Sequence, residues 1–341
     1  RINNVEIPFE RNVDFKYNDR VKGEVYEPFQ IIPPVSAKIN EKVLIFPNSK
    51  SKVVPVTITA GKNELSGQLT LQTSENWKID PKTSNFNLKE KGASITIKFT
   101  VTPPKDQEEA ILKPIVNLDG TNYSDEIVTI DYNHIPLQTL VLPSKTKLVK
   151  LNIQKKGENI GYIQGAGDVV PESLEQIGFS VTKIDPKSIS ASSLADFDAI
   201  VLGLRAYNTV GELKYKQPAL LKYVENGGTL IVQYNVNRGI IVDKFAPFSI
   251  ELSRDRVTEE NAEVRFLTPD HPVLNKPNKI TAKDFENWVQ ERGLYFADNW
   301  APEFTPILSM NDKNETPKNG SLLIAKYGKG YFIYTGLIFF R

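Results

Sequence analysis

Residues 159–168 read Asn159-Ile-Gly-Tyr-Ile-Gln-Gly-Ala-Gly-Asp168, an apolar run that passes directly into a glycine-rich loop. The next segment, residues 171–178, starts with a proline and ends with a glycine, which favours a helix with a first-turn proline and a glycine stop. Residues 179–184 are strand-like again. Strand, helix and strand in this order predict a right-handed βαβ unit and therefore a parallel sheet.

The same alternation continues toward the end of the chain. The later predicted elements are strands at residues 198–203, 229–233, 322–327 and 330–335, with a helix over residues 218–225. The run at 198–203 is apolar throughout, as in a strand buried on both faces, and the last two strands are joined by a hairpin turn. Residues 143–341 are therefore predicted to form an α/β domain with three layers, of the flavodoxin-like kind.

Residues 1–142 show a different pattern, because short runs alternate apolar and polar side chains and are separated by turn residues. The runs are residues 43–46, 53–59, 67–73, 93–101, 111–118 and 126–131. They predict an all-β, Ig-like sandwich of two sheets. Trp77 is predicted to be its large buried anchor, and residues 1–35 are expected to be an extended lead-in with an edge strand.

Residues 136–147 are predicted to connect the two domains, so the domains are placed at residues 1–142 and 143–341. The last residues, 330–341, stop abruptly after an apolar, strand-like run. We therefore expect the chain to be a piece of a longer protein and its α/β domain to be truncated at the C-terminal end. Targeting signals of the parent protein would then lie outside this sequence.

The composition excludes several classes of function. The chain has 341 residues, and 42 basic against 41 acidic side chains give a formal net charge of +1. Nucleic-acid binders carry a basic excess, so nucleic acid is not an expected partner. No apolar run reaches the ~18 residues of a membrane helix, so no membrane span is predicted. The chain has no cysteine and only two histidines, His134 and His271, so disulfides, thiol nucleophiles and zinc sites built from Cys or several His are excluded. No metal and no cofactor is expected.

Ligands of open α/β sheets bind beyond the carboxyl ends of the strands. Three loops follow predicted strands in this way, and their polar side chains are candidate ligand-binding groups: Gln164, Asp168, Arg205, Tyr207, Asn208, Asn235, Asn237 and Arg238. Arg205 could offer a bidentate fork to a carboxylate, and Tyr207 a flat surface for a sugar ring. Alternatively, the asparagines and glycines shape turns and helix caps, and the arginines pair with local carboxylates.

Two later segments supply further candidates. His271 lies in Thr268-Pro-Asp-His-Pro272, a turn-like sequence in which a histidine is either structural or catalytic. In residues 284–293, Trp288, Glu291 and Arg292 could face a pocket. Phe285, Trp288 and Val289 stand at helical spacing and could equally form one buried face.

Other catalytic and cofactor signatures are weak or missing. No Gly-x-Ser-x-Gly elbow occurs in the sequence, and there is no cysteine to replace its serine. Gly165-Ala-Gly167 before a helix has two glycines of a dinucleotide loop, but Val170 stands where the third glycine belongs. A nucleotide is therefore not an expected cofactor.

Several segments resemble known families. Asp19-Arg-Val-Lys-Gly-Glu-Val-Tyr-Glu-Pro28, followed by Pro33-Pro-Val35, resembles the segment downstream of the catalytic domain in long, exported PIG-L (LmbE-like) deacetylases of bacteria. The strand-rich region around Trp77-Lys-Ile-Asp-Pro81 is similar to NEW3-type Ig-like modules of carbohydrate-active proteins. The second half is similar to the class I glutamine amidotransferase-like fold in its ThuA-like branch, on residues 161–168, 201–208, 223–228 and 270–272. Together these segments span nearly the whole chain.

The resemblance implies an accessory region, because the catalytic residues of those families are missing. True amidotransferases have a cysteine elbow after the strand that here reads Leu230-Ile-Val-Gln-Tyr-Asn235, and this chain has Tyr234 and Asn235 at that place. PIG-L deacetylases bind zinc through a His-Pro-Asp-Asp motif and a distal histidine, which Pro269-Asp-His-Pro272 does not match. A deacetylase site of the parent protein would lie upstream of Arg1, and that catalytic domain would be a partner of this region.

Three functional hypotheses result. The first is a non-catalytic accessory region of a larger N-acetyl-sugar deacetylase that assists recognition of a glycan or sugar derivative. The second is an independent hydrolase of a sugar derivative that uses Asp168, His271 and Glu291. The third is a purely structural or protein-interaction module. Because the deacetylases that the chain resembles are exported, a periplasmic or secreted location is expected.

Overall fold

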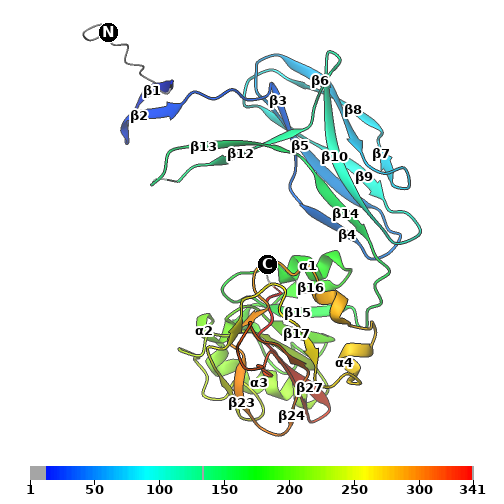
Figure 1. Cartoon of the computed structure of the whole chain (residues 1–341), viewed down its shortest axis with the longest axis vertical. Helices are drawn as coiled ribbons and strands as arrows, with labels where there is room; N and C mark the ends of the chain where they lie inside the picture. The colour runs from blue at the N-terminus through cyan, green and yellow to red at the C-terminus, as the bar shows by residue number, and fades with distance from the viewer. Residues whose placement is uncertain (1–12, 133, 340–341) are drawn as a thin grey trace. The chain divides into compact units, whose positions relative to one another are not determined.

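The computed structural model describes residues 13–132 and 134–339, and the chain divides into two compact units, Arg1–Asn152 and Ile153–Arg341. The first unit contains an antiparallel β-sandwich, and the second a mostly parallel sheet with helices (Figure 1). The predicted fold class, an all-β sandwich followed by an α/β domain, is therefore confirmed.

The sandwich consists of two sheets. One has the order β3 (Val35–Ile39), β5 (Lys52–Ala60), β9 (Ser94–Thr102) and β7 (Lys78–Asp80). The other has the order β4 (Val43–Phe46), β14 (Thr146–Lys150), β10 (Glu108–Leu118), β6 (Leu65–Gln72) and β8 (Thr83–Leu88), with β11 (Thr121–Tyr123) paired to β10. All of these pairs are antiparallel except β14 with β4. In β5, Val54, Val56 and Ile58 are fully buried while their neighbours are less so, which explains the alternation in the sequence.

Trp77 is buried as predicted, with only 4% of its surface exposed. It directly precedes β7 of the first sheet and meets Phe46 of the second sheet edge-on, with ring centroids 5.0 Å apart. Its indole N–H donates a hydrogen bond of 3.0 Å to Glu108 Oε1 on β10. The side chain therefore joins the two sheets of a sandwich that has no cysteine.

The connection between the units lies further along the chain than the sequence predicts. Residues 136–147, the predicted linker, contain β13 (Gln138–Pro143) and the beginning of β14. Because β14 pairs with both β4 and β10, it belongs to the sandwich. The units therefore divide after Asn152, and the predicted boundary at 142 and 143 is corrected.

Two hairpins in the first unit pair with no other strand of the described chain. β1 (Asp14–Asp19) pairs with β2 (Gly23–Pro28), so this part of the lead-in forms a hairpin of its own instead of the predicted edge strand. β12 (Asp125–Ile130) pairs with β13. Both hairpins carry exposed apolar or aromatic side chains, namely Phe15, Tyr17, Tyr26, Leu140, Val141 and Leu142.

The main sheet of the second unit has the order β16-β15-β17-β18-β27-β26-β24. These strands are β16 (Ser180–Lys183), β15 (Asn159–Ile163), β17 (Ala199–Leu202), β18 (Thr229–Gln233), β27 (Gly330–Thr335), β26 (Leu322–Tyr327) and β24 (Phe304–Pro306). The first five run parallel, and β26 and β24 add an antiparallel edge. The predicted parallel sheet and the predicted final hairpin are both present.

Helices cover both faces of this sheet, which gives the predicted three layers. Ile200 and Leu202 of β17 pack in a core with α3 (Leu213–Glu225) and α2 (Ala206–Thr209). Val201, between them, belongs to a separate cluster with Tyr162 and with residues of α1 (Val170–Gln176). Alternate residues of one strand therefore enter different cores, as in a strand buried on both faces.

Short elements complete the second unit. They are η1 (Pro186–Ser188), η2 (Ala282–Phe285), α4 (Pro272–Asn275), and the small two-stranded sheets β19 (Ile250–Leu252) with β23 (Ala297–Trp300), β20 (Arg256–Val257) with β22 (Gly293–Leu294), and β21 (Arg265–Phe266) with β25 (Leu308–Ser309). Within the described ranges, no helix is long and apolar enough to cross a membrane.

Two expectations about helices need correction. The helix predicted to begin at Pro218 begins at Leu213, so the proline lies inside α3 on its exposed side. Residues 284–293 do not form a helix beyond the short turn η2. Phe285 is buried and stacks on Trp288, but Val289 is 69% exposed, so the three do not share one buried face.

Candidate functional site

The three loops that follow β15, β17 and β18 lie together at the carboxyl edge of the sheet. Ala166 N donates to Leu204 O at 2.7 Å, and Arg205 N donates to Tyr234 O at 2.9 Å. The first contact requires a glycine, because a Cβ at Gly165 would lie 2.0 Å from Leu204 O. The parallel topology thus joins residues 164–168, 204–208 and 234–238, as the sequence predicts.

Asp168 ties the first loop to its neighbours. Its carboxylate accepts hydrogen bonds from the Tyr162 hydroxyl at 2.6 and 2.7 Å, from Val170 N at 3.0 Å and from Leu204 N at 3.1 Å. Burial and the bond to Asp168 both raise the pKa of Tyr162. The Tyr162 hydroxyl in turn accepts from Gln233 Nε2 at 3.0 Å. A chain of hydrogen bonds therefore crosses the ends of β15, β17 and β18.

The asparagines of the loops are also engaged internally. Asn208 Nδ2 donates to Val236 O and Arg238 O, and its Oδ1 accepts from Val236 N. Asn235 is fully buried; its Oδ1 accepts from Tyr207 N at 2.9 Å and its Nδ2 donates to Gln233 O. These amides hold the second and third loops together, as the structural alternative in the sequence analysis expects.

Tyr207 does not offer a surface to a sugar ring, and that expectation is corrected. Its side chain is fully buried, and burial raises the pKa of its phenol. The hydroxyl donates to Gln217 Oε1 at 2.6 Å, and Gln217 Nε2 donates to Phe245 O at 2.8 Å. Because α2 begins immediately after Arg205, the chain turns back under the sheet edge and carries Tyr207 into the core.

Two residues with strained backbones flank Tyr234, the residue that follows β18. Arg205 has φ of 56° and Tyr295 has φ of 51°, a conformation that side-chain-bearing residues rarely adopt. The rings of Tyr295 and Tyr234 are stacked, with their centroids 5.6 Å apart. The backbone carbonyl of Tyr295 accepts a hydrogen bond of 2.6 Å from the Tyr334 hydroxyl. Such backbone strain clusters at ligand and active sites, where the surroundings impose it.

Three polar atoms of this edge have no hydrogen-bond partner among the described residues: Arg205 Nε, Asn237 Oδ1 and Gln233 Oε1. Gln233 is only 2% exposed. The other predicted loop residues lie nearer solvent, because Gln164 is half-buried and Arg238 is exposed. A buried polar atom without a partner carries a free-energy cost that a ligand or water can offset.

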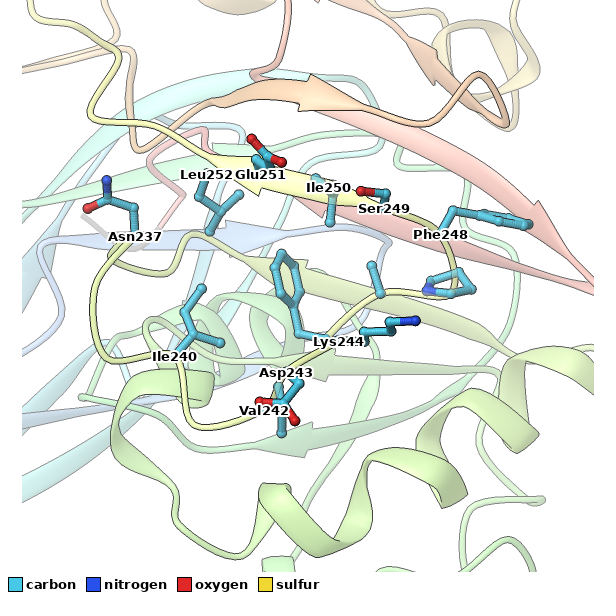
Figure 2. A pocket seen from close by; sticks show the side chains of 13 residues that line it. Asn237, Ile240, Val242, Asp243, Lys244, Phe248, Ser249, Ile250, Glu251 and Leu252 are labelled. Carbon is cyan, nitrogen blue, oxygen red and sulfur yellow. The ribbon is translucent and has the colours of Figure 1, made fainter.

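A hollow of about 660 Å³ adjoins the third loop (Figure 2). Its walls come from one stretch of chain: Asn237, Ile240 and residues 242–252. Ile240, Ile250 and Leu252 point toward one another across it, and Glu251 points away (Figure 2). The size is within the range of small-molecule sites, about 300–1,000 Å³.

Sequence reasoning missed several of these groups. Gln233 and Tyr162 lie inside apolar strands, where the surrounding pattern indicates core. Tyr295 lies far along the chain, and nothing in its neighbourhood indicates that it stacks on Tyr234. Only the position of Tyr234 after a strand, in a fold whose ligands bind there, could have marked it.

His271 occupies a structural position at the start of α4. Its Nδ1 accepts from Val273 N at 3.2 Å, and burial lowers its pKa. Asp168, the other residue that the hydrolase hypothesis names beside His271 and Glu291, lies at the carboxyl edge, where its carboxylate accepts hydrogen bonds from Tyr162, Val170 and Leu204. Within residues 13–132 and 134–339, no cluster of three or more His, Asp or Glu side chains is arranged to hold a metal ion.

Glu291 and Arg292 precede β22. Glu291 is half-buried. Arg292 is 5% exposed, and its guanidinium donates to Phe285 O and, at 2.9 Å, to Ala262 O. Burial lowers its pKa. Arg292 therefore joins the backbone at Phe285 to the backbone at Ala262 inside the unit.

Comparisons with known proteins were made on sequence and on structure. No protein-family model matches the chain, and no curated protein matches it. Among solved structures, it is distantly similar to native Escherichia coli alpha-2-macroglobulin, with 13% identity over 38% of this chain and 7% of that chain and a TM-score of 0.23.

Two shorter proteins have a similarly low structural similarity to the chain. WR4, a C. elegans MSP family member, is 10% identical over 34% of this chain and 97% of its own, with a TM-score of 0.19. The Reelin-N domain of F-spondin is 14% identical over 33% of this chain and 86% of its own, with a TM-score of 0.18. No family is assigned to the chain.

Proposed function

We propose that this chain is a non-catalytic accessory region of a larger, exported N-acetyl-sugar deacetylase of the PIG-L type, and that its amidotransferase-like unit binds a glycan or sugar derivative without converting it. The catalytic domain would be the partner on the same polypeptide, and the protein would work in the periplasm or outside the cell. The sequence resemblance supports the parent family and the ThuA-like assignment.

One observation carries the proposal of binding without turnover. At the carboxyl edge, the carboxylate of Asp168 and the amides of Asn208 and Asn235 are engaged in internal hydrogen bonds. Arg205 Nε and Gln233 Oε1 beside them have no partner among the described residues. The edge therefore offers polar atoms that can orient a ligand, while its one carboxylate is committed to holding the loops.

The neighbouring features suit a ligand with both polar and apolar faces. The stacked pair of Tyr234 and Tyr295 lies beside Arg205, and the hollow next to Asn237 combines aliphatic walls with polar groups. Sugars present hydroxyl groups at their rims and C–H groups on their faces, and aromatic rings pack well against the latter. An amide- or hydroxyl-bearing sugar therefore fits this edge better than an apolar molecule.

Binding can be tested with Arg205→Asn, since asparagine tolerates the left-handed backbone of this position. Chitin oligosaccharides serve as the probe in isothermal titration calorimetry. We expect saturable binding by the wild-type chain and about a tenfold loss in the variant, because one charge-assisted contact disappears. Lys214→Asn, at an exposed position of α3, is the control, and this variant should bind the oligosaccharide as the wild-type chain does. Equal affinities in all three chains would contradict the proposal.

Catalysis is tested separately. Glutaminase and zinc-supplemented deacetylase assays on N-acetylglucosamine derivatives are expected to remain at background. A rate that His271→Ala or Asp168→Ala abolishes would instead establish the independent hydrolase. Asp168→Asn serves as the matched variant, because it keeps the size of the side chain while it removes the charge.

The exposed hairpins favour the interaction module as a second candidate. Phe15 and Tyr26 are 61% and 59% exposed, and β1 and β2 pair only with each other. A two-stranded hairpin has little stability of its own, so a covering partner such as the upstream domain would stabilise it. Phe15→Ser with Tyr26→Ser should abolish binding to a separately produced upstream domain, and Arg20→Ser should not. Unchanged binding by the double variant would rule out this surface.

A further inference from the structure

A second hollow of the α/β unit, of about 420 Å³, is lined almost entirely by charged side chains. Its lining residues are Arg254, Asp255, Arg256, Glu315, Thr316 and Lys318. None of them belongs to the three carboxyl-edge loops or to the hollow beside Asn237. The hollow is thus lined by three cationic side chains, two carboxylates and one hydroxyl group.

Lys318 is the fixed cation of this hollow. Its side chain is only 13% exposed, and its ammonium lies 2.9 Å from Glu315 Oε2 and 3.8 Å from Asp255 Oδ1. The backbone of Lys318 exchanges two hydrogen bonds with Met310, which fixes the position of this segment. Both carboxylates of the hollow are therefore engaged with the same lysine.

Arg254 and Arg256 are the other two cations of the hollow. Both are exposed, and neither forms an ion pair within the described part of the chain. Arg254 lies in the bend before β20 and Arg256 begins β20, and both line the same hollow. Asp312, the acidic residue of the neighbouring turn, already accepts hydrogen bonds from Thr258 N, Thr258 Oγ1 and Glu259 N. Burial opposes the lowering of the pKa of Asp312, but hydrogen bonds from Glu259 and Thr258 and the nearby charge of Arg256 bring that pKa below its ordinary value.

We propose that this hollow is an oxyanion-binding site, in which the guanidinium groups of Arg254 and Arg256 bind a phosphate or carboxylate group of a small ligand. A guanidinium presents paired N–H groups that match the oxygens of either anion. Lys318, held by Glu315 and Asp255, adds positive charge at a fixed place, and the Thr316 hydroxyl can donate a further hydrogen bond. The volume accommodates an anion together with the part of a small molecule that carries it.

The site is independent of the proposed glycan site. Its residues come from the segments around β20 and before β26, and none of them is Arg205 or another residue of the carboxyl edge. Loss of binding at one site is therefore separable from loss at the other.

The test uses the whole chain and two probes, inorganic phosphate and glucuronate, in calorimetry at low salt. The first probe is a free phosphate and the second a carboxylate on a sugar, so the pair distinguishes the two sources of the anion. We expect saturable one-to-one binding of at least one probe, with an affinity that decreases as salt increases. In Arg254→Ala with Arg256→Ala, that binding should weaken about tenfold or more.

The matched control is Lys276→Ala with Lys279→Ala. It removes the same amount of charge from exposed positions of the same unit, away from the hollow. Because both double variants change exposed side chains, both should fold, and circular dichroism is the measurement that checks this. The absence of saturable binding of either probe by the wild-type chain would overturn the proposal. An equal loss in both double variants would do so too, since it would show a general effect of net charge.

Discussion

Trp77 combines three interactions at one buried position. It contacts Phe46 edge-on, donates to Glu108 and fills the space between the two sheets. We expect Trp77→Ala to lower the free energy of unfolding by about 3–5 kcal/mol, because a large cavity is left and Glu108 loses a donor. Urea titration measures this. Trp77→Phe, which restores much of the volume, should cost clearly less. An effect of Trp77→Ala below about 1 kcal/mol would contradict the anchor role.

Glu108 gives the sandwich a dependence on pH. Hydrogen bonds from Ser74 and Asn76, opposed by burial and assisted by Trp77, hold its pKa below the ordinary value of 4.5. A carboxyl group with a lowered pKa in the folded state stabilises the fold above its unfolded pKa, and this contribution is lost as the pH decreases through the folded pKa. In Glu108→Gln, the decline in stability below about pH 4.5 should be shallower. Identical pH profiles would exclude this role.

At single residues, sequence reasoning succeeded where composition left few choices. Trp77 is the only tryptophan of the first unit, so a sandwich without cysteine was expected to bury it. Tyr207 shows the opposite case. The topology indicates that it follows a strand at the ligand edge, but α2 starts at Ala206 and turns its ring into the core. The direction of a side chain after a strand depends on the next turn of backbone, which periodicity does not show.

At the scale of elements, the contact between the loops after β15 and β17 depends on the absence of a side chain at Gly165. A Cβ at Gly165 would collide with Leu204 O at 2.0 Å, so Gly165→Ala must separate the loops and break the bond from Ala166 N. We expect a loss of about 1–3 kcal/mol in unfolding free energy. Gly211→Ala is the control, because its Cβ meets nothing within 4 Å, and it should change stability by less than about 0.5 kcal/mol. Equal stability of the two variants would contradict the close approach.

Elements with strong local patterns were predicted within a residue or two, and those defined by distant partners were not. β18, β26 and β27 have the predicted bounds because apolar runs and glycine turns delimit them. β14 overlaps the end of the predicted linker and lies within the predicted α/β domain, since its short run is polar at both ends and its partners β4 and β10 lie far away in sequence. The carboxyl-edge loops were predicted because the strands before them have strong local patterns. The stacking of Tyr295 on Tyr234 was missed because the two residues are distant in sequence.

For the whole molecule, the division into two units predicts two separable unfolding events. Each unit has its own apolar core, and the cores share no residue. In calorimetry of the complete chain, Trp77→Ala should lower the melting temperature of one transition, and Gly165→Ala that of the other. A single transition that both variants shift equally would show that the units unfold together.

The late position of β14 also affects how the chain is made. The edge that β10 presents over Glu108–Leu112 has no partner until β14 has left the ribosome. At about 5–20 residues per second, that interval lasts a few seconds, during which the edges of β4 and β10 are available to other chains. Nascent chains that end before Thr146 should therefore bind chaperones or aggregate, whereas those that extend past Asn152 outside the ribosome should resist proteolysis. The synthesis of β14 thus determines when the unpaired edges of β4 and β10 become protected from association with other chains.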